Sequence, residues 1–116
     1  MDNKIEVMVV TKDDLVEKMK KGGVQIVNVL DPKYYDLGMI KGSLKIPAAD
    51  LEKRLTELDK AKEVVTYCAD SSCSASSKAA ELLAAKGFNV SAYEGGIKEW
   101  TAAKLPVDAP ALIAAK

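Results

Sequence analysis

Two cysteines in a loop of small residues are the part of this chain best suited to chemistry. The stretch YCADSSCSASSK, residues 67–78, places Cys68 directly after an apolar run and Cys73 five residues later. A thiolate is the reactive form of cysteine, and backbone amides at a helix N-terminus stabilise its charge without a histidine. We therefore expect a nucleophilic Cys68 in an anion-binding loop formed by Ala69, Asp70, Ser71, Ser72, Ser74, Ala75 and Ser76.

The same residues also have ordinary structural interpretations. Cys68 could be a small buried side chain that ends a strand, and the serines could cap a helix. A C-x4-C pair can form a disulfide when the two Cα atoms come within about 7 Å, so Cys73 is a candidate resolving cysteine, or else an inert packed thiol. Two thiolates alone leave a tetrahedral metal ion short of ligands. We expect no metal and no cofactor.

Composition excludes several classes of function. The chain has 116 residues, which we interpret as a single domain over 1–116, and its 17 basic residues balance 17 acidic ones. It contains no histidine, which rules out Ser-His-Asp triads, Cys-His dyads and most zinc sites. No basic face for nucleic acid and no apolar run long enough for a membrane span are evident. Because the start, MDNKIEV, does not resemble a signal peptide, we expect a cytoplasmic protein.

Short apolar runs alternate with helical patterns, as is typical of an α/β domain with a mainly parallel sheet. Cys68 would then stand at the carboxyl end of a strand, where open α/β sheets bind ligands. We expect Thr11 to cap the first helix, and the tail 105–116 to form a short helix or to fray. The expected strands are 5–10, 24–30, 43–47, 63–67 and 88–94; the expected helices are 12–23, 48–58, 74–87 and 95–104, with a turn and a short helix over 31–38.

Three segments, in chain order, resemble the rhodanese-like domains, a family that includes single-domain sulfurtransferases. They are VNVLDPKYYDLGMIKGSLKIP, VVTYC and KAAELLAAKGFNVSAYEGGIKEW, and the resemblance runs over residues 5–104, with 105–116 as a tail. It implies a five-stranded α/β fold with helices on both faces and a catalytic cysteine that carries sulfane sulfur as a persulfide. That cysteine corresponds to Cys68. The matching positions are Asp31, Gly42, Pro47, Cys68, Gly95, Gly96 and Trp100.

The loop departs from the common family pattern. It is longer, it lacks the usual arginine or lysine, and Asp70 adds a negative charge. Pro32 follows Asp31 where the family has arginine, and Met39 replaces a frequent histidine. A family variant with a C-x4-C-x2-S loop does look like this sequence, with Cys68, Cys73 and Ser76 in place; there the first cysteine remains the sulfur carrier.

The resemblance implies a sulfurtransferase that takes sulfur from a small sulfur-containing donor and passes it to a thiol, to cyanide or to a partner protein. Since the loop lacks a cation, we expect weak activity on thiosulfate. The alternative is a non-catalytic binding or redox-sensing module. Phosphatase or arsenate reductase chemistry would need an arginine in the loop, which is absent, and ranks last. Trp100 and Phe88 are expected in the core.

Overall fold

A five-stranded sheet forms the centre of the molecule, and all its neighbouring strands are parallel. The computed structural model describes residues 7–30, 39–69 and 75–108. The strands lie in the order β1-β6-β5-β2-β4, so that β5 is central and β1 and β4 are at the edges. Their bounds are β1 (Met8–Val10), β2 (Val24–Asn28), β4 (Leu44–Lys45), β5 (Glu63–Tyr67) and β6 (Val90–Tyr93).

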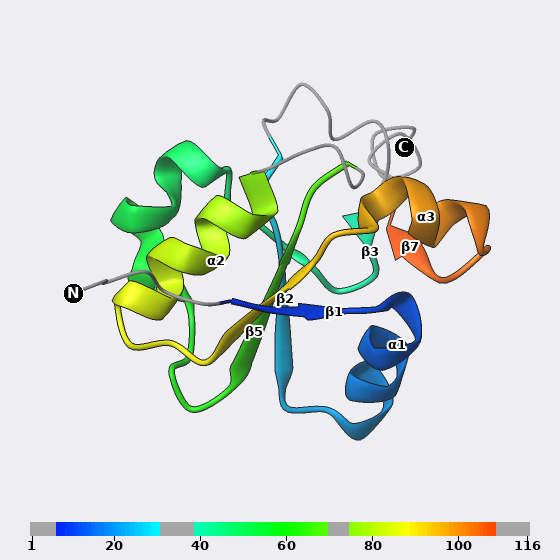
Figure 1. Cartoon of the computed structure of the whole chain (residues 1–116), viewed down its shortest axis with the longest axis horizontal. Helices are drawn as coiled ribbons and strands as arrows, with labels where there is room; N and C mark the ends of the chain where they lie inside the picture. The colour runs from blue at the N-terminus through cyan, green and yellow to red at the C-terminus, as the bar shows by residue number, and fades with distance from the viewer. Residues whose placement is uncertain (1–6, 31–38, 70–74, 109–116) are drawn as a thin grey trace.

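Helices cover both faces of this sheet, as expected for an α/β fold (Figure 1). The helices are α1 (Lys12–Lys21), η2 (Ala48–Glu57), α2 (Ala75–Ala85) and α3 (Gly96–Ala102). In Figure 1, η2 and α2 lie on one side of the strands, and α1 and α3 on the other. Thr11 caps α1 as predicted: its hydroxyl accepts the amide of Asp14, whose carboxylate accepts the amide of Thr11.

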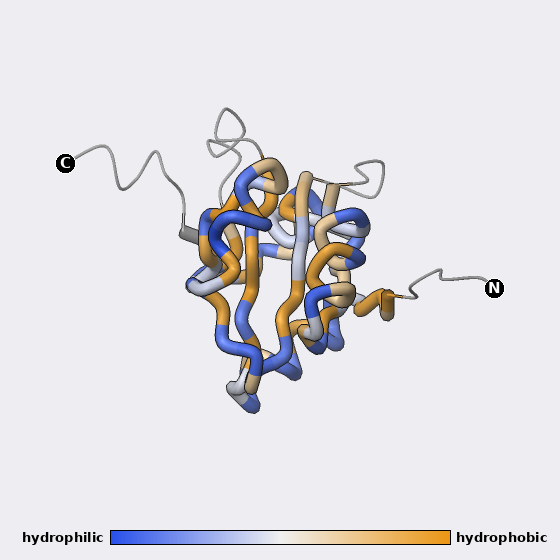
Figure 2. The backbone as a smooth tube through the Cα atoms, turned by 90° about the vertical axis from the view of Figure 1, so that its left-hand side faces the viewer, coloured by the Kyte–Doolittle hydropathy of each residue, from blue (hydrophilic) through white to orange (hydrophobic). Residues whose placement is uncertain are grey.

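The core lies between the sheet and its helices. The last three side chains of β2 and the last four of β5 are buried because helices cover both faces of these strands, which is why this part of their sequences is mostly apolar. Figure 2 shows hydrophobic residues along the middle of the strands and hydrophilic residues at the turns at the lower end. Trp100 is completely buried and packs edge-to-face on Tyr93 at 6.0 Å, and Phe88 is also buried, which confirms both predictions.

The tail 105–116, expected to form a short helix or to fray, is described only as far as residue 108. This part forms β7 (Val107–Asp108), which pairs antiparallel with the short strand β3 (Met39–Ile40). The carbonyl of Pro106 accepts hydrogen bonds from the indole of Trp100 at 2.7 Å and from the amide of Lys41 at 3.2 Å. These contacts come from distant parts of the chain, so local sequence does not indicate them.

The segment 48–58 was predicted as a regular helix but is the 3-10 helix η2, interrupted at Arg54, whose φ is −116° and ψ is 23°. Pro47, at its start, has no side-chain acceptor that could cap it. Leu51 is completely buried, so tertiary packing holds a segment whose own hydrogen bonding is weak. The strand predicted over 24–30 ends at Asn28, and the helix predicted over 31–38 lies outside the described residues.

None of the helices in the described ranges is long and apolar enough to cross a membrane.

Candidate functional site

The carboxyl ends of β2 and β5 lie side by side at the switch point of the sheet. From β2 the chain continues toward the β4 edge, and from β5 it continues toward the β1 edge. After β2 the chain continues to β3 and β4, whereas after β5 it enters α2 on the opposite face (Figure 1). The amide of Val29 bonds to the carbonyl of Tyr67 at 3.1 Å, so the two strands remain paired up to this edge. Such a switch point is where α/β sheets bind ligands. Cys68 directly follows β5 there, as its predicted position at a strand end requires.

The backbone of Cys68 is held by the first turn of α3. The carbonyl of Cys68 accepts the amide of Ile97 at 2.9 Å, and the carbonyl of Ala69 accepts the amide of Lys98 at 3.0 Å. Cys68 is only 1% exposed, and its sulfur is in a disulfide bond. The start of the loop is therefore fixed both by its own strand and by a neighbouring helix.

Two glycines make this approach of α3 possible. Gly96 has a φ of 72°, a conformation that side chains with a Cβ rarely adopt. At Gly95 a Cβ would collide with the carboxylate of Glu99. Gly96 is thus favoured where β6 turns into α3, whereas a Cβ at Gly95 would displace the flexible end of the Glu99 side chain. This turn directs the amides of residues 97 and 98 at the Cys68 loop.

The start of α2 carries a buried hydroxyl with no partner. Ala75 is the first residue of α2, and Ser76, the second, is 0% exposed. The carbonyl of Ser76 accepts the hydroxyl of Thr66 at 2.8 Å, which ties α2 to the strand that ends beside Cys68. The Ser76 Oγ itself has no hydrogen-bond partner. Buried polar groups are nearly always paired, so an unpaired one in the helix that follows the Cys68 loop needs an explanation.

Asn28 is a second such group, and sequence reasoning did not select it. It is 0% exposed at the end of β2 and lies opposite Tyr67 in the register. Its Oδ1 accepts the amide of Leu30 at 2.8 Å, and its Nδ2 has no partner. The sequence gives no sign of this unpaired amide, because burial and hydrogen-bond partners depend on the tertiary structure.

Two tyrosines secure the strand ends around the site. The Tyr67 hydroxyl accepts the amide of Ile40 at 2.9 Å and lies 2.8 Å from the Ser43 hydroxyl. The Tyr93 hydroxyl donates to the Glu99 carboxylate at 2.6 Å. Burial, and then the hydrogen bond and the negative charge of Glu99, raise the pKa of Tyr93 well above its usual value. Both tyrosines are therefore anchors of neighbouring elements.

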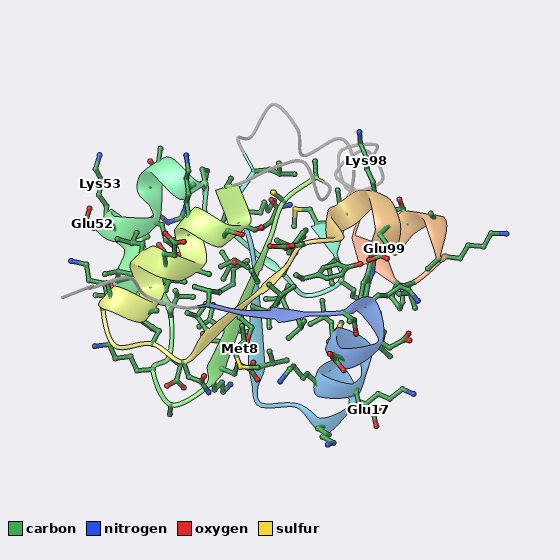
Figure 3. The ribbon with its side chains drawn as sticks, in the orientation of Figure 1. Met8, Glu17, Glu52, Lys53, Lys98 and Glu99 are labelled. Atoms are coloured by element: carbon green, nitrogen blue, oxygen red, sulfur yellow. The ribbon has the colours of Figure 1, made fainter. Side chains whose placement is uncertain are left out.

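Charged side chains from β6 and α3 also reach this edge, and sequence reasoning missed them. Glu94 follows β6 and accepts the hydroxyl of Ser77 in α2 at 3.3 Å. Lys98 is exposed in the first turn of α3, and Figure 3 shows it extending from the helix toward the edge where the strands end. In the sequence, the Gly-Gly pair after the predicted strand 88–94 was the only signal for these residues. It indicates a turn, but it places the turn near Cys68 only once β6 is known to lie next to β5.

Of the predicted site residues, the structure brings Cys68, Ala69, Ala75 and Ser76 to one edge of the sheet. The described ranges contain no group of three or more histidine, cysteine, aspartate or glutamate residues that could hold a metal ion. The remaining predicted residues lie outside the described residues: Asp31, Asp70, Ser71, Ser72, Cys73 and Ser74.

Solved structures with the same architecture include two whose names indicate the family. A rhodanese-related protein from Thermoplasma volcanium matches with a TM-score of 0.76 and 29% identity, over 86% of this chain and 96% of that one. A rhodanese-like domain protein from Staphylococcus aureus matches with a TM-score of 0.73 and 28% identity, over 81% of this chain and 91% of that one.

A further relative is named as a transcriptional regulator. The HTH-type transcriptional regulator Rv0324 of Mycobacterium tuberculosis is 33% identical over 99 residues, which are 85% of this chain. The match covers 44% of the regulator, so the chain spans less than half of that protein. The model of the rhodanese-like domain family matches residues 11–103. The chain therefore belongs to the rhodanese-like domain family.

Proposed function

We propose that the protein is a sulfurtransferase that carries sulfane sulfur as a persulfide on Cys68. The Cys68 thiolate attacks the outer sulfur of a donor such as a polysulfide, a new S–S bond forms, and the donor's S–S bond breaks with its electron pair leaving on the remaining fragment. A thiol or another nucleophile, such as cyanide or a cysteine of a partner protein, then attacks the outer sulfur and releases the thiolate. Neither step requires a metal or an organic cofactor.

The observation that carries this proposal is the unpaired Ser76 hydroxyl. It is completely buried in the second position of α2, and its backbone is bonded to Thr66, two residues before Cys68. A persulfide anion on Cys68 would accept a hydrogen bond from this hydroxyl and from amides at the start of α2. The unpaired Ser76 hydroxyl lowers the stability of the protein without sulfur. In the persulfide form it would gain a hydrogen-bond acceptor.

Thiosulfate should be a poor donor. Its two negative charges must leave water, yet residues 69–75 of the loop include no cation and do include Asp70. A polysulfide or an organic persulfide places less charge on the sulfur that is attacked. We therefore propose donors of this second kind as the better substrates.

Cys73 is proposed as the resolving cysteine. Its thiolate would attack the inner sulfur of the Cys68 persulfide, expel hydrosulfide and leave a Cys68–Cys73 disulfide, which a dithiol reduces through exchange. The disulfide bond of Cys68 in the structure supports a cycle in which this cysteine is oxidised. A reducing cytoplasm would supply the dithiol.

Mass spectrometry of the intact protein tests the proposal. The reduced protein is incubated with polysulfide, then with a thiol acceptor. We expect one added sulfur in the wild type, no added sulfur in Cys68→Ser, and loading with a longer lifetime in Cys73→Ser. Added sulfur that persists in Cys68→Ser would refute Cys68 as the carrier.

One observation favours a second function, a redox-sensing or binding module without turnover. The relative from Mycobacterium tuberculosis is named a transcriptional regulator, and this chain matches less than half of it. In such a module Cys68 would be oxidised or loaded, but would not pass its sulfur to an acceptor thiol at a catalytic rate. The acceptor stage of the same experiment distinguishes the two functions.

A further inference from the structure

A cavity of about 350 Å³ lies near the starts of β5 and β6, at the end of the sheet opposite to Cys68. It is formed where the end of η2 and the end of α2 lie on the same face of the sheet (Figure 1). Its volume is within the range of small-molecule sites, which are mostly apolar with a few polar groups. The lining residues are Leu55, Thr56, Leu58, Lys60, Lys86 and Phe88.

The inner part of this cavity is apolar and belongs to the core. Leu58 and Phe88 are each 7% exposed, and Leu55 is half-buried against the same cluster. The backbone at Phe88 is fixed, because its amide donates to the carbonyl of Leu83 at 3.0 Å and the preceding Gly87 has a φ of 92°. The apolar surface is therefore already formed before any molecule binds to it.

The ammonium of Lys60 adds a positive charge to the cavity. Its Nζ lies 5.3 Å from the centroid of the Phe88 ring, a cation–π distance. In the part of the chain that the structure describes, this Nζ forms no ion pair with a carboxylate. Its charge can therefore stabilise an anionic group of a bound molecule beside the apolar surface.

The other charges around the cavity are paired. The Nζ of Lys86, the second lysine in the lining, lies 3.3 Å from the carboxylate of Glu52. The carboxylate of Glu57 accepts the guanidinium of the arginine three residues before it at 2.7 Å, and that of Asp59 accepts a backbone amide at 2.9 Å. Of the two lysines, Lys60 is thus the one that should meet the charge of a ligand.

We propose that this cavity binds a small organic anion, a monocarboxylate with an aromatic body. The body packs on Leu55 and Leu58, and the carboxylate lies beside the Lys60 ammonium. A neutral apolar molecule would leave this ammonium without an anion, and an inorganic anion would leave the apolar surface in contact with water. The site does not depend on the proposed sulfur transfer, because the cavity and Cys68 lie at opposite ends of β5.

Titration of the reduced protein with two probes of the same shape tests the proposal. The probes are naphthylacetate, which is an anion, and naphthylacetamide, which is neutral, and binding is followed at low salt by the shifts of backbone amide signals in NMR spectra. We expect shifts concentrated at residues 55–60 and 86–88. The anion should bind about fivefold more tightly than the amide, the effect of one ion pair near a protein surface.

Substitutions separate the charge of the cavity from its shape. Lys60→Gln should lower the affinity for naphthylacetate about fivefold and leave that for naphthylacetamide unchanged. Lys62→Gln is the matched control, because Lys62 is exposed two residues further along the chain and does not line the cavity. Leu55→Ala should weaken the binding of both probes to a similar extent, since it removes apolar surface that both contact.

Amide shifts scattered over the surface, or equal affinities of the wild type for the two probes, would overturn the inference. An equal loss of affinity in Lys60→Gln and Lys62→Gln would also overturn it, because only the net charge of the protein would then matter. Sulfur loading of Cys68 should be the same in the wild type and in all three variants.

Discussion

Replacing Ser76 with alanine should stabilise the unloaded protein while weakening its persulfide. The hydroxyl is 0% exposed and has no hydrogen-bond partner, and an unsatisfied buried donor costs about 1–3 kcal/mol. Alanine has a higher helix propensity than serine, which adds roughly 0.5 kcal/mol to the free energy of unfolding. The packing lost with one buried oxygen lowers it by about the same amount. We therefore expect Ser76→Ala to raise the free energy of unfolding by about 1–3 kcal/mol.

Ser77→Ala is the matched control for this change. Ser77 is the next residue of α2, so the gain in helix propensity is the same, but its hydroxyl donates to Glu94 at 3.3 Å. The assay is urea unfolding of the reduced proteins, with equal m-values required before midpoints are compared. The difference between the two variants isolates the unpaired Ser76 hydroxyl.

The loaded protein should respond in the opposite direction. A hydrogen bond to a charged group contributes about 1.5–3 kcal/mol, so the Cys68 persulfide should lose stability by roughly tenfold or more in Ser76→Ala. Its decay is followed by intact mass in a background that lacks Cys73. The reasoning is refuted if Ser76→Ala unfolds more easily than Ser77→Ala, or if its persulfide lasts as long as that of the parent.

Three further predictions concern the loop and its surroundings. Ala75→Arg should raise kcat/KM for thiosulfate about tenfold or more by adding the cation that the loop lacks, and a smaller gain with thiosulfate than with a neutral donor would contradict this. Cys68 should be alkylated before Cys73 at mildly acidic pH, as peptide mapping would show, because a helix N-terminus favours the thiolate. Because the pKa of Tyr93 is raised in the folded state, its contribution to stability is complete below about pH 10 and is lost as the pH rises toward the folded value. Tyr93→Phe should therefore flatten the fall in unfolding free energy above pH 10, measured by denaturant titration, and an unchanged slope would show that another group titrates there.

Local patterns in the sequence were sufficient for most elements of the fold. Thr11 caps α1 because its hydroxyl and Asp14 lie at capping-box spacing, and apolar runs become the buried strands β2 and β5. The position of Cys68 followed from the same reasoning, since the predicted strand 63–67 ends directly before it, as β5 does. These features depend on interactions within a few residues, so one sequence is enough to predict them.

The arrangement around Cys68 was decided by tertiary structure. The order of the strands places β6 beside β5, and only this neighbourhood brings Lys98 to the carbonyl of Ala69. The antiparallel pairing of β3 with β7 likewise depends on contacts between residues far apart in the chain.

Ser76 is a residue that the sequence could select but whose burial only the tertiary structure decides. Sequence analysis could select Ser76 as one of several serines near a cysteine, because serine is common at helix starts. Its complete burial and missing partner result from how α2 packs on β5, where Thr66 holds its backbone. Residue types and spacing thus indicated the candidate nucleophile and the family. Packing between distant segments determined which groups surround it, because burial and hydrogen-bond partners exist only once those segments meet.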